Sequence, residues 1–194
     1  VQFVPEYGLL RGIGYSIFHS VSAFCNAGID ILGSDSLAKY ICNPLINITT
    51  MLLIILSGIG FGVWYDVLGN IKKIRKKEIP GKWWFTRLRL HSKLAIVTTL
   101  ILLAVGTLLT FLLEYHNPDT IGHLSFGEKW MASAFQSVTT RTAGYSTFSQ
   151  AGMHEETRFL NILLMFIGGS PGGTAGGVKT TTIAMLMLTC IAFV

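Results

Sequence analysis

The stretch GGSPGGTAGGVKTTT, residues 168–182, contains the residue types of a phosphate-binding loop, with six glycines in its first ten residues followed by a lysine and threonines. A P-loop has the pattern G-x-x-x-x-G-K-[ST] between a strand and a helix. Counted from Gly172, the second glycine is Gly177, but one residue separates it from Lys179. The run that precedes the stretch, 159–167, is apolar in a chain whose composition suits a membrane. Nucleotide binding is therefore the less favoured interpretation and stays open as an alternative.

Two long segments contain no charged residue, Leu45–Tyr65 and Leu94–Leu113. Each reaches the length of about 20 apolar residues that a helix needs to cross a bilayer. The whole chain is 51% hydrophobic and 13% charged, whereas soluble domains are about 25% charged. The sequence therefore predicts two membrane-crossing helices, with buried core helices of a soluble protein as the alternative.

The segment between these helices, residues 66–93, holds nine lysines and arginines but only two acidic residues, although the whole chain has a net charge of +5. Short loops rich in Lys and Arg stay on the cytoplasmic side of a membrane. We therefore expect 66–93 to be a cytoplasmic basic linker, with 1–44 and 114–158 outside. Because topology accounts for this charge, binding to nucleic acid is not expected.

The glycine-rich stretch separates two short apolar arms, 159–167 and 180–194. Neither arm spans a bilayer alone, so we expect one crossing helix, 159–194, that is broken in the middle. Pro171 has no backbone N–H and disfavours a helix, and each glycine costs about 1 kcal/mol relative to alanine in a helix. Irregular backbone at membrane depth must face protein or water. A mobile loop across an aqueous path is predicted to act as a gate.

Lys179 is the only charged residue between positions 159 and 194. An ionisable group inside a membrane segment is a candidate functional residue. It could repel cations at a closed gate, or pair with an acidic residue elsewhere in the protein. The alternative is that its long side chain reaches the cytoplasmic headgroups.

Two further segments, 12–24 and 127–138, are apolar but too short to span a membrane, as re-entrant helices are. Each leads into a polar strip, SAFCNAGID in the first case and VTTRTAGYST in the second. The tripeptide NAG of the first strip aligns with TAG of the second, 116 residues later. The chain therefore contains an internal repeat, and repeated membrane units place their binding sites where the repeats meet.

The strips have the composition of an ion pathway. A strip of extended backbone exposes a row of carbonyls, and rings of carbonyls can replace the hydration shell of a monovalent cation. Gly28 and Gly144 permit backbone angles that a side chain would forbid. Neither strip has a pair of carboxylates, so a divalent site is not favoured. The alternative is that both strips are ordinary extracellular connector turns.

The two strips and the stretch MFIGGSPGGTAGGVKTTT, in this order, resemble the Trk/Ktr/HKT superfamily of potassium-translocating subunits, most closely the bacterial KtrB/TrkH type. The resemblance covers essentially the whole chain. It implies an all-α integral membrane protein built from helix–pore-helix–helix repeats, with re-entrant pore loops and one broken transmembrane helix. Members have four repeats, and this sequence is similar to the pore part of the second repeat and to the third.

On that basis, residues 1–65 would hold the pore helix, the filter strip and the second helix of the second repeat, before the linker 66–93. Residues 94–194 would form the third repeat. Its expected parts are a first helix 94–113, a pore helix 127–138, a filter strip 139–147 and a broken second helix 159–194 with a gating loop 168–177.

The resemblance also assigns candidate site residues, none of them catalytic. The selectivity filter would be formed by Cys25, Asn26, Ala27, Gly28, Thr140, Arg141, Thr142, Ala143 and Gly144. The gate would be formed by Gly168, Gly169, Ser170, Pro171, Gly172, Gly173, Thr174, Ala175, Gly176, Gly177 and Lys179. Arg141 is expected to brace the filter rather than face ions, because its charge would repel potassium.

The function implied is uptake of K⁺, with Na⁺ as the alternative ion, through a carbonyl-lined filter that the loop gates. The resemblance implies no enzyme activity, no cofactor and no metal beyond the transported ion. It implies a homodimer, a cytosolic ring of nucleotide-binding regulatory proteins and a lipid bilayer, in a multi-pass protein of a bacterial plasma membrane. A carrier for another substrate, with the broken helix as its binding site, stays open.

The residues after the filter glycines depart from the family pattern in one copy. The usual aromatic residue is Ile29 in the first strip, where Asp30 follows, whereas Tyr145 keeps the aromatic in the second. An acidic residue at an outer mouth would attract cations. The first-repeat position that separates potassium from sodium selectivity lies outside this sequence, so the resemblance leaves the choice between the two ions open.

Overall fold

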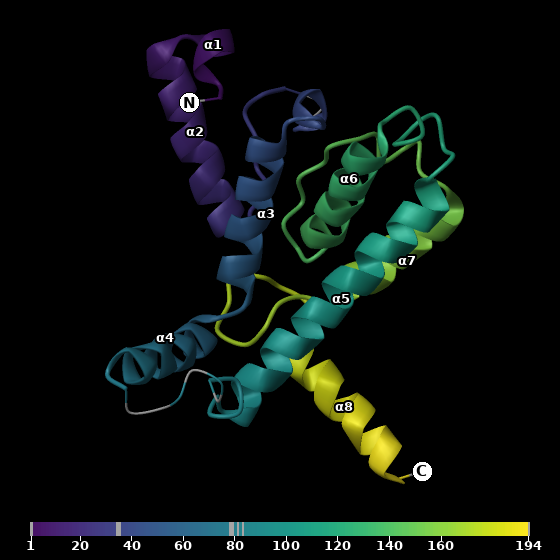
Figure 1. Ribbon diagram of the computed structural model, residues 1–194. Helices are drawn as coiled ribbons and strands as arrows, with labels where there is room; N and C mark the ends of the chain where they lie inside the picture. The colour runs from purple at the N-terminus through teal and green to yellow at the C-terminus, as the bar shows by residue number, and fades with distance from the viewer. Residues whose placement is uncertain (1, 34–35, 78–79, 81, 83, 194) are drawn as a thin grey trace.

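The computed structural model describes residues 2–33, 36–77, 80, 82 and 84–193. The described chain is helical, and its one β-bridge, between Ile167 and Val178, belongs to no named strand. The expected all-α class is therefore confirmed. In chain order the helices are α1 (Val4–Tyr7), α2 (Leu9–Phe24), the 3-10 helix η1 (Ala38–Tyr40), α3 (Pro44–Gly58), α4 (Phe61–Arg75), α5 (Leu90–Glu114), α6 (Phe126–Thr139), α7 (Glu155–Phe166) and α8 (Thr180–Phe193) (Figure 1).

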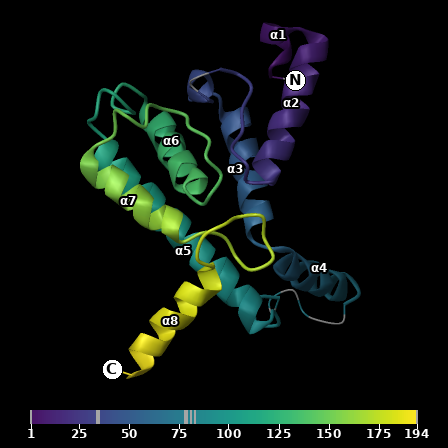
Figure 2. The same ribbon diagram turned by 180° about the vertical axis from the view of Figure 1, so that it is seen from behind.

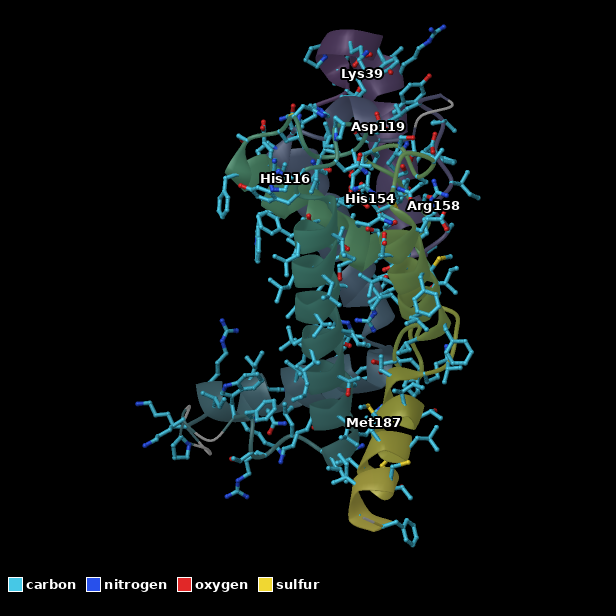
Figure 3. The ribbon with its side chains drawn as sticks, turned by 90° about the vertical axis from the view of Figure 1, so that its right-hand side faces the viewer. Lys39, His116, Asp119, His154, Arg158 and Met187 are labelled. Atoms are coloured by element: carbon cyan, nitrogen blue, oxygen red, sulfur yellow. The ribbon has the colours of Figure 1, made fainter. Side chains whose placement is uncertain are left out.

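Helix α5 is long and apolar enough to cross a membrane, and α3 with α4 would be a second candidate if the bent pair counted as one span. In the apolar 18-residue part of α5, only 28% is buried. A core helix of a soluble protein is instead buried over most of its surface. Leu100 and Leu112, for example, are 60% and 61% exposed. In Figure 3, several polar residues lie toward one end of the molecule and Met187 of α8 toward the other; the labelled polar residues are Lys39, His116, Asp119, His154 and Arg158.

Helix α6 packs along α5 and is the best-buried element of the fold. A capping box between Ser125 and Glu128 begins the helix. Gly106 of α5 permits a close approach, because a Cβ there would lie 2.4 Å from the hydroxyl of Ser137. That hydroxyl donates to the backbone carbonyl of Leu103 at 3.0 Å. These contacts fix α6 against α5, at residues 126–139 where the sequence predicts a pore helix over 127–138.

The apolar run Leu45–Tyr65 does not form one straight helix, and this prediction was wrong. Helix α3 ends at Gly58 and α4 begins at Phe61, with an angle of 96° between the two helices. Gly60 has a φ of 93°, in the left-handed region that glycine adopts without steric cost. The described residues therefore contain two breaks within apolar runs where the sequence predicts one.

A loop far along the sequence completes the end of α3. The last carbonyls of a helix have no partner within it. Here the carbonyl of Ser57 accepts a hydrogen bond from the N–H of Thr174 at 3.3 Å, and that of Gly58 accepts one from the N–H of Ser170 at 2.9 Å. Tertiary contacts thus stabilise the bend that the hydropathy of the segment does not reveal.

The predicted basic linker 66–93 is helical at both of its ends. Helix α4 continues to Arg75, and α5 begins at Leu90, earlier than the expected start at residue 94. Residues 78–79, 81 and 83 of the predicted linker lie outside the described residues. Three basic residues occupy the last turn of α4, where cations favourably oppose the helix dipole: Lys72, Lys73 and Arg75.

The second break separates α7 from α8. Helix α7 ends at Phe166 and α8 begins at Thr180, so the interruption contains the whole predicted gating loop 168–177. Figure 2 shows this segment as a loop between the two helices that reaches toward the junction of α3 and α4. The N–H of Gly168 donates to the carbonyl of Val178 at 3.0 Å, and the N–H of Val178 donates to the carbonyl of Phe166 at 3.0 Å. Paired backbone therefore closes the base of the loop.

Candidate functional site: two glycine strips and the loop attached to them

The two polar strips have positive φ angles at the same two positions. Asn26 and Thr142 have φ angles of 51° and 69°, and Gly28 and Gly144 have φ angles of 62° and 97°. Each strip directly follows the C-terminus of a short helix, α2 or α6. Since a helix C-terminus carries partial negative charge, both helices present a favourable field to a cation near the strips. The internal repeat in the sequence is thus also a repeat in conformation.

The strips meet backbone to backbone at their glycines. A Cβ on Gly28 would lie 1.9 Å from the carbonyl oxygen of Ala143, so only glycine fits there without moving the second strip. A Cβ on Gly144 would find Gly28 Cα as its nearest neighbour, at 3.7 Å. Ala143 is buried. The structure therefore brings together the ends of two tripeptides that lie 116 residues apart in sequence.

The remaining predicted filter residues differ in environment. Cys25 and Ala27 are exposed, whereas Thr140 is buried and its hydroxyl donates to the carbonyl of Ser137 at 2.9 Å. Among the described residues, no group of three His, Cys, Asp or Glu side chains is placed to hold a metal ion.

Sequence reasoning missed a pair of hydroxyls that hold the two strips. The Ser22 hydroxyl donates to the carbonyl of Ile29 at 2.7 Å, and the Thr139 hydroxyl donates to the carbonyl of Tyr145 at 2.7 Å. Each bond joins the end of the short helix to the residue after the strip glycine. The phenol of Tyr145 also donates to the carbonyl of Ile29 at 3.3 Å, so the second strip supports the first. Ser22 and Thr139 lie 117 residues apart, one more than the spacing of the strips, so the alignment of the two copies does not pair these hydroxyl residues.

Arg141 lies between the second strip and the glycine-rich loop. Its guanidinium is buried and donates through Nη2 to the carbonyl of Gly168 at 3.1 Å and to the hydroxyl of Thr99 at 3.4 Å. The described residues form only two ion pairs, Lys39–Glu6 and Arg158–Glu155, and neither involves this residue. Arg141 therefore connects the strip to the start of the loop and to α5.

The glycine-rich loop is not an open cradle of backbone N–H groups. Besides the pairing at its base, the N–H of Gly169 donates to the carbonyl of Gly176 at 3.3 Å, and the N–H of Gly173 donates to the carbonyl of Ser170 at 3.1 Å. The Lys179 ammonium donates to the carbonyl of Ala175 at 2.8 Å. A P-loop binds phosphate with free amides and its lysine. These donors already have partners, so the geometry does not favour nucleotide binding.

The tip of the loop is fitted against the junction of α3 and α4. The N–H of Phe61 donates to the carbonyl of Gly172 at 3.2 Å. A Cβ on Gly60 would lie 2.4 Å from the carbonyl oxygen of Pro171, and a Cβ on Gly173 would lie 2.7 Å from that of Gly58. Glycines on both sides therefore permit two backbones to touch, a requirement that the loop sequence alone could not reveal.

Comparisons with known proteins agree on one family. A family model described as TrkH, cation transport protein, matches residues 2–194. Ktr system potassium uptake protein B of Bacillus subtilis strain 168 is 40% identical over 193 residues, which cover 100% of this chain and 40% of that protein. Potassium/sodium uptake protein NtpJ of Enterococcus hirae is 42% identical over 190 residues, covering 97% of this chain and 39% of the relative. The chain thus spans about two fifths of the length of these curated relatives.

A solved structure has the same fold. The crystal structure of the potassium transporter TrkH from Vibrio parahaemolyticus aligns with a TM-score of 0.71, over 92% of this chain and 35% of that chain. The two sequences are 21% identical. At this level of identity the likeness concerns the fold alone, that is, the arrangement of the helices.

Proposed function

The chain belongs to the TrkH family of cation transport proteins, and from this premise we propose that it forms part of a pathway for potassium uptake across a bacterial plasma membrane. The two strips would supply two quarters of a carbonyl-lined selectivity filter, and the glycine-rich loop 168–177 would be its gate. Transport of this kind involves no covalent chemistry and no cofactor.

One observation carries the proposal: two strips of matching conformation touch each other and both contact the same loop. Gly28 lies against Ala143, which supports a shared axis for the two strips. Asn26 of the first strip and Thr142 of the second each hydrogen-bond to the loop. A loop attached to both halves of an ion-binding surface is in position to block or open the path that the surface forms.

The position of Arg141 supports a bracing role. Its guanidinium donates to Gly168 and Thr99, while carbonyls supply the ion-binding surface. A positively charged side chain in the row of carbonyls would repel the transported ion. Lys179 would likewise repel cations while the gate is closed. Its hydrogen bond to the carbonyl of Ala175 places its positive charge within the loop, which would have to move for ions to pass.

Potassium is the proposed ion, with sodium as the alternative. Glycine in both strips matches the potassium-selective pattern that the family resemblance implies, and one similar protein is described as a potassium uptake protein, another as a potassium/sodium uptake protein. We extend the proposal to assembly: a homodimer of full-length subunits in the membrane, controlled by a cytosolic ring of nucleotide-binding proteins. The basic end of α4 would face that side.

The test is ion flux through the full-length protein in proteoliposomes, with protein-free vesicles as the blank. We expect uptake of K⁺ and Rb⁺ in preference to Na⁺. Deletion of the loop tip, residues 172–175, leaves the paired base of the loop in place and should raise the rate of uptake. An unchanged rate in a folded deletion variant would remove the gating role. Absence of K⁺ and Rb⁺ uptake would favour the carrier of another substrate instead.

A further inference from the structure

Asn26 and Thr142 occupy matching positions in the two strips and share an uncommon backbone conformation. Their φ angles of 51° and 69° lie in the left-handed region, which is rare for residues with a Cβ and rarest for β-branched residues such as threonine. Residues held in this way cluster at binding sites and switches, where surrounding contacts maintain them. In both strips, the side chain of this residue contacts the glycine-rich loop.

Asn26 binds the loop through its side-chain amide. The Nδ2 group donates to the hydroxyl of Thr174 at 2.8 Å and to the hydroxyl of Ser57 at 3.3 Å. The same Thr174 hydroxyl donates to the carbonyl of Phe24, at the end of α2, at 3.3 Å. Asn26 is 8% exposed, so its amide is enclosed by the loop and α3. The Thr174 hydroxyl of the loop is thus held by two groups, the side-chain amide of Asn26 and the backbone carbonyl of Phe24.

Thr142 binds the loop through its hydroxyl. The Oγ1 atom accepts a hydrogen bond from the backbone N–H of Gly176 at 2.9 Å. A Cβ on Gly176 would lie 3.8 Å from the Thr142 methyl group, an ordinary contact, so space does not require a glycine there. Thr142 binds the backbone N–H of Gly176, so the interaction depends on the position of the loop and not on the side chain at residue 176.

From these contacts we propose that Asn26 and Thr142 are positioning residues that latch the loop shut, each strip supplying one tie to residues 174–176. These ties are in addition to the bond of Arg141 to Gly168 at the start of the loop. The inference rests on the proposed function, because it assigns a task to the loop that would be the gate. The two tied loop residues, Thr174 and Gly176, are separated by one residue. Movement of the loop away from the strips must therefore break both ties together, which makes the closed position cooperative.

The latch also explains why the two positions keep their strained conformation although their side chains differ. In the left-handed region the side chain is turned toward the loop in both strips, and the amide and the hydroxyl use opposite polarities: Asn26 donates to the loop, whereas Thr142 accepts from it. The shared feature of the repeat is the direction of the side chain. The carbonyls of residues 25–28 and 140–144 accept no hydrogen bond from the described residues and would be left for the ion.

The test uses isosteric variants of the full-length protein. Thr174→Val removes the hydroxyl that Asn26 holds, and Thr142→Val removes the acceptor for Gly176. Thr182→Val is the matched control, because Thr182 is exposed and its hydroxyl makes no hydrogen bond within the described residues. Two quantities are measured: amide hydrogen exchange over 168–179, and uptake of K⁺ and Na⁺ in proteoliposomes.

We expect each latch variant to raise loop exchange and potassium uptake about fivefold, the change expected from one neutral hydrogen bond, with an unchanged ratio of K⁺ to Na⁺. The double variant should multiply the two effects. Thr142→Ser retains the acceptor, so loop exchange in this variant should stay at the level of the parent protein, which separates loss of the bond from loss of fold.

Loop exchange at the level of Thr182→Val in both latch variants would overturn the latch. A changed ratio of K⁺ to Na⁺ would also overturn it, because the side chains would then act on the ion path itself. Faster exchange without faster uptake would support the latch and contradict the gating role of the loop, so the failure of this inference and the failure of the proposed function give different results.

Discussion

The two strips have one conformation but two different surroundings. Gly28 and Gly144 both have positive φ angles, 62° and 97°. At Gly28, however, an added Cβ would overlap the carbonyl oxygen of Ala143, at 1.9 Å, whereas at Gly144 the nearest atom would be 3.7 Å away. The first glycine is therefore required by conformation and by space, and the second by conformation alone. Equal residues in an internal repeat thus need not carry equal structural weight.

The largest effect is expected from a direct comparison of these two glycines. Gly28→Ala must displace the second strip, so we expect it to abolish the preference for K⁺ over Na⁺ in the full-length protein, a loss of at least about tenfold. Gly144→Ala introduces only the cost of a left-handed residue, about 1–2 kcal/mol, and should retain part of the preference. Gly69→Ala is the control, since nothing lies within 4 Å of its added Cβ.

Equal loss of preference in the Gly28 and Gly144 variants would show that conformation alone matters and would remove the asymmetry between the strips. No loss in either variant would contradict their assignment to a selectivity filter. The measurement is competitive uptake of K⁺ and Na⁺ in proteoliposomes at matched protein density.

A second, smaller effect is expected at the bend between α3 and α4. Gly60 has a φ of 93°, and its added Cβ would lie 2.4 Å from the carbonyl oxygen of Pro171 in the loop. Gly60→Ala should therefore push the tip of the loop from its seat and raise potassium uptake several-fold, with the ion preference retained. Gly62→Ala, two residues along in α4, has open space around its Cβ and should leave uptake unchanged.

Uptake by Gly60→Ala at the parent level, in a folded protein, would show that the contact between bend and loop does not influence the gate. Hydrogen exchange over residues 168–179 provides an independent measure of loop position, and it should rise in Gly60→Ala but not in Gly62→Ala.

The bend also shows where prediction from sequence reaches its limit. The composition of the glycine-rich loop and the repetition of the two strips are visible in the sequence, so both could be located from it. The run SGIGFG at 57–62 lies inside a segment that is apolar throughout, and hydropathy carries no information on direction. The 96° angle depends on donors from the loop more than a hundred residues away. A long-range partner of this kind leaves no local signal.

The same reasoning applies to the side chains of the site. The glycines could be assigned from the sequence because a backbone requirement permits few residue types. The side chains of Asn26 and Thr142 share a task, yet they differ in chemistry, and only their contacts with the loop connect them. The hydroxyls of Ser22 and Thr139 do the same work in the two copies, but they lie 117 residues apart, one more than the strips, so alignment of the repeat does not pair them.

The smallest expected effect concerns these two hydroxyls, whose bonds have equal length but unequal support. The carbonyl of Ile29 accepts from Ser22 at 2.7 Å and also from the phenol of Tyr145 at 3.3 Å. The carbonyl of Tyr145 accepts from Thr139 at 2.7 Å, with no second donor among the described residues. Thr139→Val should therefore lower the preference for K⁺ up to about fivefold, the equivalent of about 1 kcal/mol, and Ser22→Ala less.

Thr110→Val, which removes a buried hydroxyl without a partner in the described chain, should change neither preference nor rate. A larger loss in Ser22→Ala than in Thr139→Val would mean that the phenol does not substitute for the lost donor, and that each repeat holds its strip independently.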